Sequence, residues 1–139
     1  MKAELTAVAN EMLHAPEKDV AAIGSALQTA IGSVQVGLPY IEGIVTAIDA
    51  FDYALKHGAE ATERIEEYRG QVLSAIAALG IERFEATPGD RLDPKLCEAI
   101  AAVERGPGQA PSEVVEVCRA GYRFGGKVLR VCQVVASRA

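Results

Sequence analysis

The chain has 139 residues, of which 50% are hydrophobic and 24% charged, and its formal net charge is −5 at pH 7. This length suits one ordinary domain, or a helical segment with a small β module, and it excludes two large domains. With this negative net charge the chain lacks the excess of positive charge that most nucleic-acid-binding proteins carry, so DNA and RNA are poor candidates for partners.

The start of the chain and its cysteines indicate a cytoplasmic protein. No basic region followed by a compact apolar run opens the sequence, so we expect no secretory signal. Cys97, Cys118 and Cys132 are odd in number and have no CxxC spacing, which favours packing roles over a zinc site or a disulfide framework. Cys118 and Cys132 would lie opposite each other only around a three-residue loop centred on Gly125; a two-residue loop would offset them by one.

The first half of the chain is predicted to be helical. A first helix covers Lys2 to His14 and closes near Pro16, because proline disfavours helix in the residue before it. From Glu17 the apolar residues recur every seven positions, which is a helical stripe: Val20, Leu27, Val34, Ile41, Ile48 and Leu55.

Two arrangements of this stripe are open. One unbroken helix to Lys56 would be about 60 Å long at 1.5 Å per residue, more than the rest of the chain can cover, so a second copy of the helix is the expected cover. Gly37, Leu38 and Pro39 favour the alternative, two helices hinged there and folded as a compact bundle, because proline removes a helical hydrogen bond and can break the rod.

The stripe also raises the question of a membrane. Residues 20 to 41 carry no charge, and that length could span a bilayer. Polar residues, however, gather on one side of this helix and apolar residues on the other, which is typical of a helix packed against protein. We therefore expect no membrane span, and membrane contact through residues 20–41 is the lesser alternative.

A second helix is predicted after His57-Gly58, a pair typical of a helix end. It runs to about Leu79 with Gly80 as its stop. Two helices joined by a short loop tend to lie antiparallel, and doubled in a dimer they would form a four-helix bundle. Residues 1–80 are therefore assigned to a helical stalk and dimerisation bundle.

Residues 81–139 show the pattern of a small β domain. Ile81 to Phe84 is a predicted strand, and Asp93 as N-cap with Pro94 at the first helical position predicts a short helix to about Val103. Residues 106–111 are a loop.

The end of the chain predicts a β-hairpin. From Val114 to Val135 two apolar, β-branched runs are joined by Gly125 and Gly126, which reach the positive φ of a tight turn without steric cost. The fold class is therefore α+β, a long N-terminal helix and a helical bundle followed by a small β domain.

Four segments resemble, in sequence and order, the GrpE family of nucleotide exchange factors, which act on DnaK-type chaperones. The strongest elements are Leu92-Asp93-Pro94, Glu98-Ala99, Gly121-Tyr122 and the run from Gly126 to Arg130. Their ordered combination is more specific than any one of them. The resemblance covers roughly the last hundred residues, in the segments 41–55, 64–84, 91–104 and 114–137.

This resemblance implies a homodimer of long paired helices and a four-helix bundle, with a small β domain on each protomer. It also implies that the β domain enters the nucleotide cleft of the chaperone ATPase domain and favours the open cleft, so that ADP leaves faster without any catalytic group. Chaperone contact is then expected at Lys127 first, at Arg130 and Arg123 next, and at Gly126, Asp93 and Pro94. The dimer interface is expected at Ile41, Ile48, Phe51, Leu55, Ile65, Val72 and Ile76.

Several positions depart from the family pattern. The region before the bundle is short and largely uncharged, Cys97 stands where histidine is common, and Val131-Cys132 replaces a usual Pro-Ala. Arg64 stands where glycine is common, near a helix face that the family brings toward the chaperone. The short stalk and Arg64 motivate the alternative function, a GrpE-like dimeric adaptor or scaffold without exchange activity.

The sequence gives little support for an enzyme. His14 and His57 have no Ser, Cys or Asp neighbour in a nucleophile motif, and glycine-rich phosphate loops are absent. Asp49 and Asp52 are three residues apart on a helix, a spacing that fits a solvated face better than acid–base chemistry. We expect no catalytic group, no metal and no cofactor.

Overall fold

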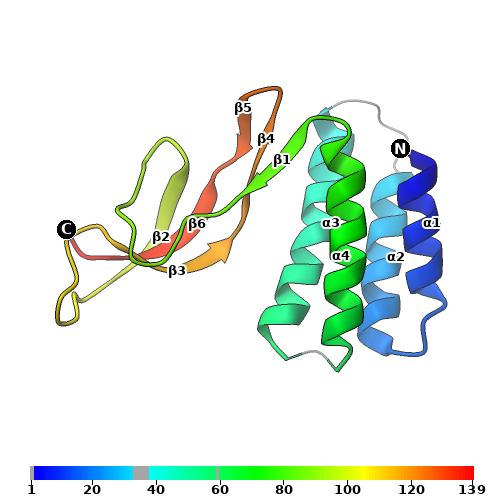
Figure 1. Cartoon of the computed structure of the whole chain (residues 1–139), viewed down its shortest axis with the longest axis horizontal. Helices are drawn as coiled ribbons and strands as arrows, with labels where there is room; N and C mark the ends of the chain where they lie inside the picture. The colour runs from blue at the N-terminus through cyan, green and yellow to red at the C-terminus, as the bar shows by residue number, and fades with distance from the viewer. Residues whose placement is uncertain (1, 33–37, 59) are drawn as a thin grey trace. The chain divides into compact units, whose positions relative to one another are not determined.

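The computed structural model describes residues 2–32, 38–58 and 60–139 and divides into two compact units, Met1–Leu79 and Gly80–Ala139 (Figure 1). The first, called the helical unit below, contains four helices, and the second, the β unit, contains six strands. This composition confirms the predicted α+β class.

The helical unit is a four-helix bundle. Its helices are α1 (Lys2–Leu13), α2 (Lys18–Gly32), α3 (Leu38–Lys56) and α4 (Thr62–Ala77). Each packs on the next in the chain, and α1 also packs on α4, so the four close a ring (Figure 1). The two-helix alternative is therefore the one found, with the stripe divided between α2 and α3. α3 begins with Leu38 and Pro39. Proline is tolerated in the first turn of a helix, because an N–H group there would have no partner within the helix. Gly37 lies outside the described residues.

The core of the bundle is built from all four helices of one chain. Its fully buried side chains include Leu5, Met12, Val20, Leu27, Ile44, Ile48, Phe51, Ile65, Val72 and Ile76. The part of the stripe that the structure describes is thus covered by the other helices of the same chain. Among the described residues, no helix has the length and apolar character needed to cross a membrane.

The β unit consists of two three-stranded sheets. In the first sheet β4 (Gly121–Phe124) lies between β1 (Ile81–Phe84) and β5 (Lys127–Arg130), all antiparallel. In the second, β6 (Cys132–Ser137) lies between β2 (Cys97–Val103), which is parallel to it, and β3 (Val114–Arg119), which is antiparallel. Cys97, Val114, Cys132 and Val134 form one buried cluster of this unit, and Tyr122 is also fully buried.

The short helix predicted from Asp93 to Val103 is wrong. Asp93 opens a single turn, in which its carboxylate Oδ1 accepts the N–H of Lys95 at 3.0 Å and its carbonyl accepts the N–H of Cys97 at 2.8 Å. From Cys97 the chain is strand β2, paired with β6. The long-range ladder with β6 therefore overrides the local helix signal, because strand formation depends on the neighbours that the fold supplies.

The glycine-hinged hairpin is confirmed, but it is shorter than the predicted span of Val114 to Val135. It consists of β4 and β5 alone. The outer parts of both apolar runs, β3 and β6, pair with each other in the second sheet. The two apolar runs, each continuous in the sequence, are thus divided between the two sheets.

The cysteines are three unpaired thiols, and their arrangement differs from the one considered for a three-residue loop. Cys132 lies opposite Cys97 in the β2–β6 ladder, whereas Cys118 falls at an irregularity of the β3–β6 pairing. Burial, together with the nearby Cys132, raises the pKa of the Cys97 thiol. Because the thiolate is the reactive form, this thiol should react slowly.

Thiol labelling of the native protein should therefore modify Cys118 first. Cys118 is half-buried, whereas Cys97 and Cys132 are buried in the core. At pH 8 we expect one thiol per chain to react quickly and the other two only after unfolding, with the slow phase faster at higher pH as the thiolate fraction rises. Mass spectrometry of iodoacetamide-treated protein measures this, and Cys118→Ser is the control that should remove the fast phase. Fast labelling of Cys97 in the folded protein would contradict the burial.

Candidate functional site

The β4–β5 hairpin is closed by a tight two-residue turn. Phe124 pairs with Lys127, so Gly125 and Gly126 form the whole loop. Both have positive φ, 57° and 81°. These are the requirements of a type I′ turn, which matches the twist of the strands and strains any residue with a side chain. The turn therefore fixes the position of Lys127 at the start of β5.

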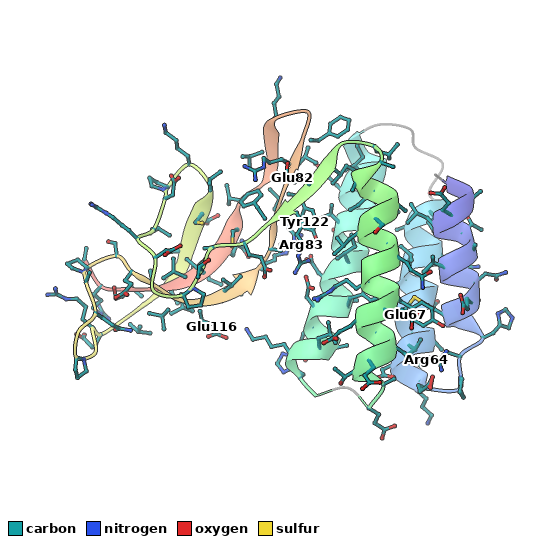
Figure 2. All side chains as sticks on the ribbon, in the orientation of Figure 1. Arg64, Glu67, Glu82, Arg83, Glu116 and Tyr122 are labelled. Atoms are coloured by element: carbon teal, nitrogen blue, oxygen red, sulfur yellow. The ribbon has the colours of Figure 1, made fainter. Side chains whose placement is uncertain are left out.

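The base of the hairpin is braced around Tyr122. The ring of Tyr122 is fully buried, and its hydroxyl accepts a hydrogen bond of 2.9 Å from Arg83 (labelled in Figure 2). The guanidinium groups of Arg83 and Arg130 lie 5.9 and 5.2 Å from the ring centroid, within cation–π range. Arg130 also donates to the carbonyl of Ala120 at 2.8 and 3.1 Å. Arg130 thus joins β5 to the chain just before β4.

Arg123 joins the hairpin to β1. Its guanidinium lies 4.9 Å from the ring centroid of Phe84, and one nitrogen is 3.3 Å from the carboxylate of Glu82. The Phe84 ring lies directly over Gly121, where an added Cβ would be 2.3 Å from the ring. Only glycine fits under this ring without displacing it. Two of the three cations assigned to chaperone contact are therefore engaged within the β unit.

Lys127 differs from these two arginines. It is exposed, and no hydrogen bond or ion pair ties its ammonium to another residue in the part of the chain that the structure describes. Beside it, Phe124 and Val128 are 38% and 39% exposed, so apolar area lies next to the cation. Phe124, Lys127 and Val128 are called the hairpin tip below.

The two apolar members of the tip, Phe124 and Val128, were not predicted from the sequence. The sequence does contain a signal for their exposure. Phe124 directly precedes the glycine pair and Val128 lies two residues after it, so both are at the turn end of the hairpin, away from Tyr122. Strand alternation alone places Phe124 on the same face as Tyr122 and so assigns it to the core. Only the burial along β4, where Gly121 and Tyr122 are buried and Phe124 is exposed, shows that the core ends before Phe124.

The other predicted site residues are not members of the hairpin tip. Gly126 belongs to the turn, whereas Asp93 and Pro94 are exposed in the turn before β2, a strand of the second sheet, and do not belong to the hairpin. The residues assigned to a dimer interface lie in the bundle of one chain. Six of the seven are buried there, and Leu55 is partly buried: Ile41, Ile48, Phe51, Leu55, Ile65, Val72 and Ile76.

The described architecture is thus a four-helix bundle followed by two small sheets, of which the first carries the exposed hairpin tip. The model of the GrpE family matches residues 32–138. Relatives named "Protein GrpE" include those of Alcanivorax borkumensis, 35% identical over 115 residues, and Natronomonas pharaonis, 33% identical over 99 residues. A third, from Limosilactobacillus reuteri, is 30% identical over 101 residues.

These matches cover 82%, 70% and 73% of this chain and 57%, 45% and 52% of the respective relatives. The chain thus spans about half the length of the curated relatives it matches. Because the family model matches most of the chain, the chain belongs to the GrpE family. The resemblance stated from the sequence is confirmed.

Proposed function

We propose that the chain is a co-chaperone that docks on the ATPase domain of a DnaK-type chaperone and accelerates the release of ADP. Membership of the GrpE family supports this role. The observation that carries it is the hairpin tip, an exposed cation with two exposed apolar side chains on a tightly closed hairpin whose base is braced by Tyr122 and Arg130. The protein acts in the cytoplasm, and it needs no cofactor of its own.

The proposed action requires binding alone. A partner that binds the open and closed forms of the nucleotide cleft equally shifts nothing, so the tip must bind the open form more tightly. A braced hairpin suits this task, because a docking element that is already ordered loses little conformational entropy on binding. Lys127 is the proposed contact to an acidic rim of the cleft, and Phe124 and Val128 supply apolar area next to it.

Arg130 and Arg123 take a supporting role in this proposal. Each already has partners within the β unit, so each holds the hairpin in shape while its exposed edge stays available to the chaperone. Asp93 and Pro94 form a second, separate contact. The homodimer expected from the resemblance remains a prediction, since the residues assigned to it are packed inside one chain in the structure.

Charge reversal at Lys127 should remove most of the exchange activity. The measurement is the release rate of a fluorescent ADP analogue from a DnaK-type ATPase domain, with the parent and with Lys127→Glu. We expect at least about a tenfold loss of acceleration at subsaturating concentration, since about 1.4 kcal/mol of lost binding corresponds to tenfold in affinity. Phe124→Ala should weaken the same step, because it removes apolar area from the tip.

The matched control is Lys18→Glu, which makes the same charge reversal at an exposed position of the helical unit. It should release ADP as fast as the parent. Equal rates for Lys127→Glu and the parent would remove the hairpin tip from the mechanism. Binding of the parent to the ATPase domain without any acceleration would instead identify the adaptor, the alternative that the sequence left open.

A further inference from the structure

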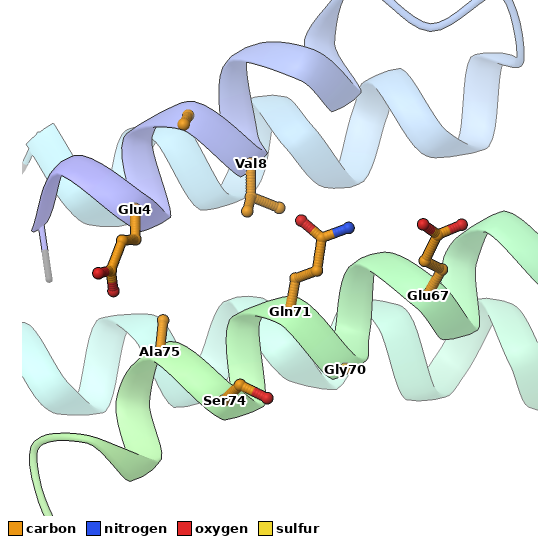
Figure 3. Close-up of a pocket in the computed structure, with 8 residues that line it drawn as sticks. Glu4, Val8, Glu67, Gly70, Gln71, Ser74 and Ala75 are labelled. Atoms are coloured by element: carbon orange, nitrogen blue, oxygen red, sulfur yellow. The ribbon is translucent and has the colours of Figure 1, made fainter.

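A groove runs along the surface of the helical unit between α1 and α4 (Figure 3). Its volume of about 710 Å³ is enough for several side chains of a partner. The match to the family model begins at residue 32, so the α1 side of the groove lies outside that match. The groove is lined by Glu4, Ala7, Val8, Glu67, Gly70, Gln71, Ser74 and Ala75.

The middle of the groove is made of small and apolar residues. Val8 and Ala75 are each 7% exposed and form its floor, and Ala7 is exposed beside them. A Cβ added at Gly70 would meet nothing within 4 Å, so this part of the groove is open. Because the distance between packed helices depends on the side chains at their contact, small residues here let a third helix approach α1 and α4 closely.

A carboxylate lies at each end of the groove. Glu4 lies at the end near Ala75 and Glu67 at the other end, with Val8 between them (Figure 3). Both glutamates are exposed, and neither has a hydrogen bond or ion pair within the part of the chain that the structure describes. Because Glu67 and Ala75 are eight residues apart on α4, the two ends are about 12 Å apart at 1.5 Å per residue.

The two cations of α4 are engaged with other partners. Arg64 donates to both carboxylate oxygens of Glu17 at 2.7 and 2.8 Å, and Arg69 is 2.8 Å from the carboxylate of Asp52 on α3. Among the described residues, no cation lines the groove. Residues 1–79 contain five Lys or Arg and eleven Asp or Glu, a formal charge of −6, whereas residues 80–139 contain nine and eight, a formal charge of +1. The groove therefore attracts positive charge.

We propose that this groove binds a cationic helix of another protein. The helix carries two Lys or Arg seven or eight residues apart on one face, with small apolar side chains between them. That spacing is about 11–12 Å along a helix, which matches the separation of the two ends of the groove. The cations pair with Glu4 and Glu67, and the apolar face packs on Val8. A second copy of the chain does not fit as the occupant, because its helical unit has the same excess of carboxylates.

The probe for this groove is a fluorescent peptide of about 18 residues, rich in alanine and glutamine, with two lysines seven residues apart and a leucine between them on the same helix face. Fluorescence anisotropy measures its binding to the full chain at low ionic strength. We expect saturable binding that weakens as salt is added, because exposed charge pairs are screened. A peptide of the same composition with its lysines on opposite faces should bind at least about tenfold more weakly. Equal binding of the two peptides, or no binding of the first, would overturn the proposal.

Two substitutions test the charge and the shape of the groove separately. Glu67→Lys should weaken binding of the first peptide about tenfold, because an attraction becomes a repulsion, whereas Glu42→Lys, the same change at an exposed position of α3, should leave it unchanged. Gly70→Leu should block the groove and retain the circular dichroism of the parent, because its side chain projects into open space. Equal affinities of Glu67→Lys and Glu42→Lys, or of Gly70→Leu and the parent, would place the peptide elsewhere and refute the assignment.

An exchange of charges gives the converse test. The double variant of Glu4→Lys and Glu67→Lys should bind a peptide in which both lysines are replaced by glutamate, which the parent should repel. A folded double variant that still prefers the lysine peptide would contradict the proposed pairing.

Discussion

Replacing Tyr122 by alanine should lower the free energy of unfolding of the β unit by about 3–5 kcal/mol, the range found when a large buried side chain is removed from a core. Tyr122 is fully buried. Its hydroxyl accepts a hydrogen bond from Arg83, and its ring makes cation–π contacts with Arg83 and Arg130. Its loss leaves a cavity and also releases the brace of the hairpin. Hydrogen exchange with mass spectrometry measures this loss separately for residues 80–139.

Tyr122→Phe is the matched variant, because it keeps the ring and removes only the hydroxyl. It should cost about 1–2 kcal/mol, the value of one hydrogen bond to a partly exposed charged group. Arg83 retains a contact of 3.6 Å with Glu85 in this variant. If Tyr122→Ala and Tyr122→Phe lowered protection equally, the ring would not be the brace. Protection in the helical unit should not change in either variant.

Replacing Ile48 by aspartate should unfold the helical unit or lower its stability by more than about 4 kcal/mol, because an unpaired buried charge adds to the loss of apolar packing. Ile48 is fully buried at the centre of α3. Urea denaturation followed by circular dichroism at 222 nm measures the effect. Because the same side chain belongs to the predicted dimer interface, the variant should also be unable to pair.

Leu55→Asp is the comparison for this effect, since it makes the same chemical change in the same helix at a partly buried position. Its carboxylate can reach water, so we expect a cost of about 1–2 kcal/mol. Equal losses at the two positions would contradict the burial of Ile48 within a single chain. Sedimentation velocity on both variants then reports whether either residue governs association.

For the candidate site, the sequence was informative about the turn and less so about the cations. Gly125 and Gly126 carry the conformation of the turn themselves, so their pairing into a hairpin is a local property. Three cations around the turn look alike in the sequence, but Arg123 and Arg130 find side-chain partners on β1 and before β4, whereas the ammonium of Lys127 has none among the residues that the structure describes. These partners are distant in the chain, and no local pattern identifies them.

The helical periodicity of the first half, the glycine turn of the hairpin and the family were determined by the sequence, because periodicity, glycine and proline act over a few residues. Tertiary structure decided which surfaces meet. The seven-residue stripe does not say whether its cover comes from the same chain or from a second one, and β2 is a strand only because β6 is beside it. In both cases the deciding energy is the burial and pairing of segments far apart in the sequence, which exists only once the chain is folded.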